Sequence, residues 1–506
     1  MPAKSSAVHD SKGGESPLKI LFVVSECAPY AKTGGLADVA AALPAALQKL
    51  GHDVRIVMPL YDCIDRNRHG IRPDGAACVH MGNGEEQWVG VHNSLLGGKT
   101  PVWLVECHRF FGRPGIYDEL WGEYGDNAFR YALLSKAALQ ICKDRKFIPD
   151  VMHAHDWQSA LVPVFLKTWD RILSPLSDTA SVLTIHNIGH QGVYHSSVFP
   201  YIGVGDEHFT QVKFEDHGKI NLLKGGIFFA DAITTVSPTH AREIFEPIGG
   251  HGLAPRLQAR RDDVTGILNG VCYDRWNPET DSLIPVKYSA KNLAGKWVCK
   301  MALQERFGLE TRLDTPIFGV VSRLAPQKGL HLLKEVLPRI MDQMNAQVVV
   351  LGSGDSGMED FFRWAPSAYP GRVGSFIGFW EDLSHLIEAG SDFFVMPSLY
   401  EPCGLNQMYS MKYGTLPVVR ATGGLNDSVQ NYDEATGAGT GFKFWDPTPD
   451  ALYYTIGWAV STWHDRPQHM SQLRQQAMAQ DYSWRDSAQR YLDVYRHAIW
   501  RHSQWR

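Results

Sequence analysis

The chain has 506 residues, and this length exceeds what one hydrophobic core usually supports, so two or more domains are expected. Its 44 % apolar and 20 % charged residues are typical of folded globular proteins and exclude an intrinsically disordered chain. The net charge of −5 gives no basic footprint for nucleic acid, and no apolar run is long enough to span a membrane. Neither nucleic acid nor a membrane is therefore expected as a partner.

The cysteines and the first residues predict where the protein works. The eight cysteines are scattered without a Cys-x-x-Cys pair, which favours a reducing compartment and gives no zinc ribbon. Residues 1–18 are polar and lack the apolar segment of a signal peptide, so a short disordered tail is expected there. Together these features predict a cytoplasmic protein.

A strand, a glycine-rich loop and a helix open the folded part of the chain. Leu18–Ser25 is a nearly continuous apolar strand, and apolar residues then recur at helical spacing over 36–50. The loop between them is cationic and carries Lys32, Gly34 and Gly35. With a next strand at Asp53–Met58, this order is typical of a nucleotide-binding half-sheet. An ordinary tight turn explains the loop equally well.

Polar residues follow further predicted strands where each strand ends. Val151–His153 runs into His155 and Asp156, and Ser181–Ile185 runs into His186 and Asn187. Since carboxyl ends of parallel strands meet at one edge of a sheet, this edge is predicted to be functional. No metal is expected at His153, His155 and Asp156, because adjacent strand positions point to opposite faces of the sheet. His186 on its own is equally compatible with a histidine of the core.

A second series of strands and helices begins after residue 265. Its predicted strands are Pro316–Ser322, Gln347–Leu351, Val373–Ile377, Phe393–Met396 and Leu416–Val419. The pattern predicts an α/β protein of two doubly wound, Rossmann-like domains with a cleft between them, over 19–265 and 266–483. The amphipathic stretch that starts at residue 484 could pack on either domain.

Two cations and one acid of the second series are candidates for chemistry. Arg323 and Lys328 follow a buried strand at the start of a helix, where fixed positive charge suits a diphosphate. Glu401 follows Phe393–Met396 at the same edge of the sheet. The simpler alternatives are solvated surface charges for the cations and a favourable helix-dipole position for Glu401.

Neither a dinucleotide cofactor nor a metal is predicted. Gly352, Gly354 and Gly357 match the spacing of a dinucleotide loop, but no acid stands about 20 residues further on to hold a ribose. The chain also contains no Asp-x-Asp, the pair that metal-dependent sugar transferases use.

Eight segments resemble the family of bacterial glycogen synthases and plant starch synthases, in the same order along the chain. The resemblance covers the chain from about Lys19 to its end. The segments are Lys32–Val39, His153–Gln158, Thr184–Gly192, Val236–Ile244, Ile267–Val271, Val321–Leu330, Glu401–Gln407 and Gly414–Val429.

The resemblance implies a GT-B glycosyltransferase that elongates an α-1,4-glucan such as glycogen from ADP-glucose, with retention of configuration, no cofactor and no metal. It implies that the last helix, within 484–506, returns to the N-terminal domain. Catalytic roles are implied for Glu401, His186, Arg323 and Lys328. Substrate-binding roles are implied for Lys32, Gly34, Gly35, Asp38, Tyr117, Asp156, Asn187, Asn269, Cys403, Gly404, Leu405, Thr422, Gly423 and Gly424.

The sequence departs from the family at Cys272, Asn406 and Phe379, where Asp, Thr and Tyr are usual. These departures affect the expected affinity for the donor more than the reaction class. Two alternatives stay open: a retaining transferase with a small acceptor, of the sucrose or trehalose type, and a non-catalytic sugar-binding protein of the same fold. The first differs in its acceptor, and the second would tolerate loss of Glu401.

Overall fold

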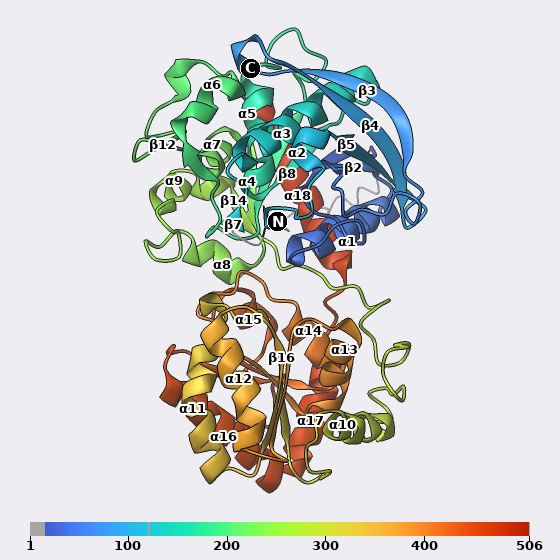
Figure 1. The fold of residues 1–506 in the computed structure, drawn as a ribbon, viewed down its shortest axis with the longest axis vertical. Helices are drawn as coiled ribbons and strands as arrows, with labels where there is room; N and C mark the ends of the chain where they lie inside the picture. The colour runs from blue at the N-terminus through green and yellow to red at the C-terminus, as the bar shows by residue number, and fades with distance from the viewer. Residues whose placement is uncertain (1–15, 120–121, 505–506) are drawn as a thin grey trace, which may run out of the picture.

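The computed structural model describes residues 16–119 and 122–504, which form two α/β bodies joined at a narrow waist (Figure 1). Most of the predicted tail, residues 1–15, lies outside the described residues. The predicted class, α/β with two doubly wound domains, is confirmed. The boundary predicted between residues 265 and 266 stays a prediction.

The N-terminal body is built on one large sheet. In the described part of the chain this sheet has nine strands, in the order β14 (Val264–Gly266), β13 (Ala232–Thr235), β9 (Ala180–Ile185), β8 (Val151–His155), β1 (Lys19–Val23), β2 (Asp53–Pro59), β5 (Thr100–Glu106), β4 (Glu86–Leu96) and β3 (Arg72–His80). The strands from β14 to β5 are parallel, and Ile20 of β1 pairs with Val54 on one side and Val151 on the other. The carboxyl ends of these parallel strands therefore share one edge of the sheet.

The C-terminal body contains a smaller sheet whose strands are all parallel. In the described residues its order is β17 (Val373–Ile377), β16 (Gln347–Gly352), β15 (Ile317–Val321), β18 (Phe393–Met396), β19 (Leu416–Arg420) and β20 (Phe442–Phe444). β15, β16 and β18 are almost entirely buried because helices cover both faces, which explains their continuous apolar sequences.

Helices lie between the strands along the chain. Those of the N-terminal body used below are α1 (Gly35–Lys49), α3 (Asn127–Asp144), α4 (Asp156–Ser159), α6 (Phe199–Ile202) and α8 (Pro238–Glu243). Those of the C-terminal body are α10 (Ala294–Arg306), α11 (Leu330–Gln343), α12 (Ser356–Ala368), α13 (Glu381–Gly390), α14 (Asn406–Lys412), α15 (Gly423–Ser428), α16 (Pro449–Asp465) and α17 (Pro467–Met478). No helix in the described ranges combines the length and apolar character required for a bilayer-crossing segment.

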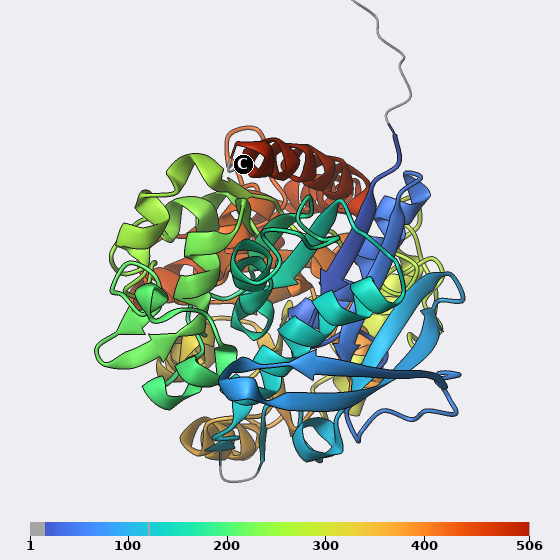
Figure 2. The ribbon, with the colours of Figure 1, turned by 90° about the horizontal axis from the view of Figure 1, so that it is seen from above.

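The last helix, α18 (Trp484–Ser503), crosses back to the N-terminal body, where it lies along the large sheet (Figures 1 and 2). It contacts α1 and strands β8, β9 and β13. Tyr491 and Tyr495 are fully buried in the N-terminal core, and the Tyr495 hydroxyl lies 2.9 Å from His153 Nδ1. Burial of this apolar face makes α18 part of the N-terminal core, although it follows the C-terminal body in sequence.

Candidate functional site

Glu401 and Lys328 form a close ion pair at the edge of the C-terminal sheet. Lys328 ends a short 3₁₀ turn after β15, and Glu401 lies in the loop after β18, so neighbouring strands deliver both groups. Lys328 Nζ donates to Glu401 Oε2 over 2.6 Å, and Ser398 Oγ donates to the same oxygen over 3.1 Å. The Glu401 side chain is only 7 % exposed, so it is held in a fixed position.

Two glycines of α15, Gly423 and Gly424, pack directly against the backbone of the Glu401 loop. A Cβ on Gly423 would lie 1.9 Å from the Glu401 carbonyl oxygen, and one on Gly424 would lie 2.2 Å from that of Cys403. Gly424 N–H also donates to the Glu401 carbonyl over 3.1 Å. Only glycine permits so close an approach of two backbones, which explains the Gly-Gly pair. Both glycines therefore support the loop directly.

The loop from Cys403 to Leu405 leads into α14. No side chain among the described residues caps this helix, and an uncapped helix start suits an anion. Asn406 donates through its side-chain amide to the Val321 carbonyl over 2.9 Å, which ties the helix to β15. Arg323 is exposed, and no described residue forms an ion pair with it. This cation and helix terminus suit a diphosphate.

The cationic loop before α1 is fixed by an acid that the sequence prediction missed. Glu26 is 4 % exposed and accepts hydrogen bonds from Thr33 Oγ1, Gly34 N–H and the Tyr117 hydroxyl, over 2.7, 3.1 and 2.6 Å. The Tyr117 hydroxyl, for which a substrate-binding role was predicted, therefore bonds to a carboxylate of the protein in this structure. Glu26 directly follows the predicted strand Leu18–Ser25, and polar residues at the carboxyl ends of parallel strands were the signal that singled out His186. The same signal could have found Glu26.

Lys32 is paired within its own domain. Its Nζ lies 2.8 Å from both carboxylate oxygens of Asp38 in α1. The two domains nevertheless meet at this loop, because a Cβ on Gly35 would lie 3.9 Å from Leu405 Cδ1. Lys32 is thus paired with Asp38 and Lys328 with Glu401, each within its own domain. The loop that carries Lys32 therefore approaches the C-terminal domain at Leu405.

Two histidines and one aspartate lie at the carboxyl ends of β8 and β9. His155 Nδ1 lies 2.9 Å from His186 Nε2, and Asp156 Oδ1 accepts the backbone N–H of His186 over 2.7 Å. Asp156 has φ +53°, an uncommon backbone conformation that often marks functional sites. Burial lowers the pKa of His186 to about 3, and burial raises the pKa of Asp156 to about 7. His186 is consequently neutral at physiological pH.

The predicted residues Asn187 and Asn269 both hydrogen-bond to residues near Glu401 in the loop after β18. Tyr400, next to Glu401 in sequence, donates its hydroxyl to Asn187 Oδ1 over 2.6 Å. The backbone of Asn269 hydrogen-bonds to Cys403, and Asn269 Oδ1 is a buried acceptor without a partner among the described residues. A buried acceptor of this kind suits a sugar hydroxyl or a water.

Glu243 joins the domains at a point that the sequence prediction also missed. From the end of α8 it accepts Thr422 Oγ1 over 2.9 Å and Gly423 N–H over 3.0 Å, at the start of α15. Burial raises its pKa, but the hydrogen bonds from His240, Gly423 and Thr422 outweigh burial and leave the pKa below its usual value. The Thr422 and Gly423 donors, expected to face substrate, are thus occupied by a protein carboxylate in this structure.

Replacing Glu243 by alanine is expected to lower kcat/KM about three- to tenfold, because a helix cap of about 1 kcal/mol that crosses the domain interface is lost. Steady-state kinetics at varied donor concentration measure the change. Glu246→Ala, an exposed neighbour in sequence, is the matched control and should leave kcat/KM unchanged. Equal values for both variants would show that the contact is not needed in the active arrangement.

Comparison with known proteins agrees with this geometry. Residues 19–259 match the family described as starch synthase catalytic domain, and residues 302–477 match glycosyl transferases group 1. The chain is 49 % identical over 484 residues to glycogen synthase 1 of Geobacter sulfurreducens, covering 95 % of this chain and 96 % of that protein. It is 46 % identical over 488 residues to a glycogen synthase of Treponema denticola, covering 95 % and 99 %.

Solved structures give the same result. The catalytic domain of starch synthase IV from Arabidopsis thaliana, bound to ADP and acarbose, superposes with a TM-score of 0.88 at 34 % identity, over 96 % of this chain and 100 % of that chain. A sucrose-phosphate synthase from Thermosynechococcus elongatus shares only the fold, with a TM-score of 0.58 at 16 % identity over 95 % and 98 % of the two chains. The chain therefore belongs to the glycogen and starch synthase family of GT-B glycosyltransferases.

Proposed function

We propose that this protein transfers glucose from ADP-glucose to the non-reducing end of an α-1,4-glucan such as glycogen, with retention of configuration and release of ADP. The observation that carries the proposal is the ion pair between partly buried Lys328 and buried Glu401, which lies beside the uncapped start of α14. A cation, a carboxylate and free N–H groups at one place meet the needs of a sugar diphosphate.

The charge changes of the reaction fit these groups. As the bond between the anomeric carbon and the phosphate breaks, negative charge grows on the diphosphate and positive charge on the sugar. Lys328, Arg323 and the first turn of α14 stabilise the leaving diphosphate. Lys32 can contribute when its ion pair with Asp38 opens. Glu401 holds sugar hydroxyls and keeps Lys328 in position.

The N-terminal domain supplies the sugar side of the site. Because His186 is neutral, its ring can lie beside the positively charged sugar of the transition state without repelling it. Asp156 fixes the backbone of His186 and Asn187 through its carboxylate oxygen. We assign Asp156, Asn187 and Asn269 to donor or acceptor sugar binding, with Cys403, Gly404 and Leu405 as backbone donors to glucose and phosphate.

Retention follows in this proposal from attack on the face that the diphosphate leaves. The acceptor hydroxyl forms the new bond to the anomeric carbon while the bond to the diphosphate oxygen breaks. The departing phosphate oxygen takes the proton of the hydroxyl, so no protein nucleophile is needed. Closure of the two domains around the substrates excludes water and prevents hydrolysis of the donor.

Parallel assays with ADP-glucose and UDP-glucose on glycogen test the proposal. Release of ADP together with longer glucan chains is the expected result, with much slower transfer from UDP-glucose. Transfer from UDP-glucose alone would refute the assigned donor. Transfer to a small sugar but not to glycogen would instead favour the sucrose- or trehalose-type alternative.

A further inference from the structure

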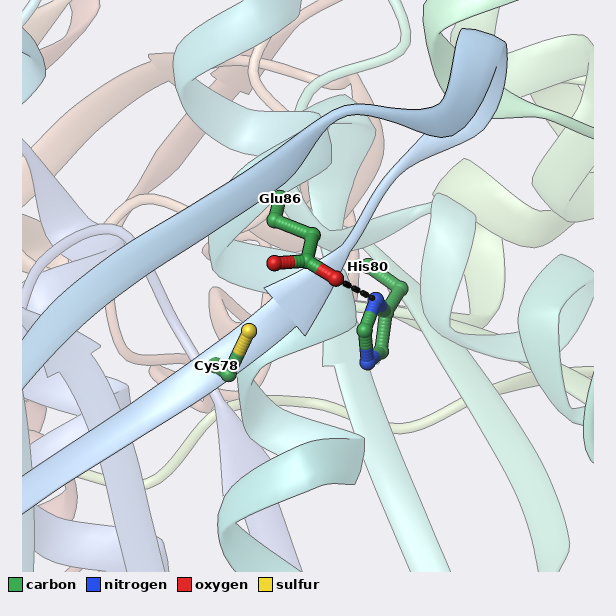
Figure 3. Close-up of side chains that lie close together, drawn as sticks. All are labelled: Cys78, His80 and Glu86. Carbon is green, nitrogen blue, oxygen red and sulfur yellow. Dashed lines mark ion pairs between the residues drawn. The ribbon is translucent and has the colours of Figure 1, made fainter.

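The end of the β3–β4 hairpin brings together three side chains of different chemistry, Cys78, His80 and Glu86 (Figure 3). The Cys78 sulfur, a ring nitrogen of His80 and a carboxylate oxygen of Glu86 all lie within 4.8 Å of one another. His80 Nδ1 and Glu86 Oε1 are 3.5 Å apart. The sequence prediction had no basis for grouping them, because it recognised neither strand.

Strand geometry explains why these side chains converge. Cys78 and His80 are two residues apart on β3 and therefore point to the same face of the sheet. Glu86 opens β4 and pairs directly with His80 in the antiparallel register. Side chains paired in this way stand side by side on one face. The three ligands thus come from regular backbone positions.

The turn that joins the two strands is itself held in place. Met81 N–H donates to the Glu85 carbonyl over 2.8 Å, and Glu85 N–H returns a bond to Gly82 over 3.2 Å. Gly82 packs so closely on α6 that a Cβ would lie 1.9 Å from the Pro200 carbonyl oxygen. The ligands therefore stand on a hairpin whose end is fixed, which limits the entropy lost when they bind an ion.

The local charge also favours a cation. Glu86 places a carboxylate beside the Cys78 sulfur and the His80 ring, so a divalent cation bound among the three atoms would meet negative charge there. Thiolate, imidazole and carboxylate are the ligand types that proteins use for zinc.

We propose that Cys78, His80 and Glu86 form a binding site for one divalent transition-metal ion of the zinc class, with water completing the coordination. Tetrahedral zinc ligands lie about 3.3–3.8 Å apart, so small side-chain rotations close the site. The ion would fasten the edge strand β3 to β4. Three strands separate β3 from β1, so the site lies about 19 Å from the strand that leads to the cationic loop. The inference is independent of the proposed function.

Titration with cobalt(II), a spectroscopic substitute for zinc, tests the site. One cobalt ion per chain is expected, with a sulfur-to-cobalt charge-transfer band that zinc abolishes by displacement. Cys78→Ser should remove the band. His80→Ala and Glu86→Gln should each weaken binding about tenfold or more, since even the loss of a residue behind a ligand costs about 10- to 100-fold in affinity.

Cys63→Ser removes an exposed cysteine elsewhere and is the matched control, which should bind cobalt like the unaltered chain. Circular dichroism and glucosyl transfer report whether each variant is folded, and both should be unchanged because the hairpin end is remote from the interdomain site. Absence of the band, its survival in Cys78→Ser, or unchanged affinity in both His80→Ala and Glu86→Gln would overturn the proposal.

Discussion

Replacing Glu401 by glutamine is expected to lower kcat about a hundredfold, a loss of about 3 kcal/mol in transition-state stabilisation. The side chain keeps its size but loses the charge that fixes Lys328, 2.6 Å away, and the acceptor strength that sugar hydroxyls need. Because Glu401 is 7 % exposed, water cannot replace the lost charge well. Initial rates of ADP release with glycogen as acceptor measure the effect.

Glu388→Gln is the matched control for this substitution. Glu388 is also buried in the C-terminal domain, but it bonds to Ser410, and burial raises its pKa to about 8. It is therefore mostly protonated at neutral pH, and the amide should leave the rate unchanged. If Glu401→Gln retained full activity, the catalytic assignment would fail and the sugar-binding alternative would gain.

The double variant Glu401→Gln with Lys328→Met should lose less activity than the sum of the two single losses in free energy, since the pair acts as a unit.

The parallel strands were predictable because burial on both faces leaves a plain signal. β15 and β16 have no exposed face, and their apolar runs were recognised within one or two residues of the observed bounds. The β3–β4 hairpin was not recognised as a pair of strands. β3 is an edge strand with half its residues exposed and a bulge near Pro73, so neither alternation nor an apolar run marks it. Its pairing depends on contacts that local sequence does not encode.

The prediction that polar residues at the ends of neighbouring parallel strands lie together had a similar basis. Lys328 and Glu401 follow neighbouring parallel strands, and the structure places them in contact. Glu243 and Tyr400 act across the domain interface, so their roles depend on how two separately folded sheets meet. No local pattern carries that information. The conformations of Lys32 and Tyr117, which bond to Asp38 and Glu26, were unpredictable on the same ground.

Lowering the pH from 7 to 5 is expected to destabilise the N-terminal domain through His153, His155 and His186. Burial lowers the pKa of His153, His155 and His186, in the last case to about 3. In the unfolded chain these rings take up protons below a pKa of about 6.5, so below that pH the unfolded state binds more protons than the folded state. The free energy of unfolding therefore decreases as the pH is lowered. For His186 the loss is about 2 kcal/mol at pH 5, at about 1.4 kcal/mol per pH unit.

Asp156 opposes this effect with the opposite sign. Its folded-state pKa of about 7 exceeds the unfolded value of about 3.9, so the folded state binds the extra proton and gains stability as pH falls through that range. The gain from Asp156 is about as large as the loss from His186, and the loss that His153 and His155 contribute in the same direction remains. Thermal unfolding at several pH values measures it, followed through the transition of the N-terminal domain.

Substitution of His186 by asparagine should make the decrease in Tm between pH 7 and pH 5 smaller, because one buried proton acceptor is removed. His217→Asn is the control: its side chain is fully exposed, so folding does not desolvate it and the slope should stay that of the unaltered chain. An identical slope in His186→Asn would mean that the ring accepts a proton in the folded state. The neutral imidazole assigned to the sugar side of the site would then be wrong, since a charged ring there would repel the positive sugar of the transition state.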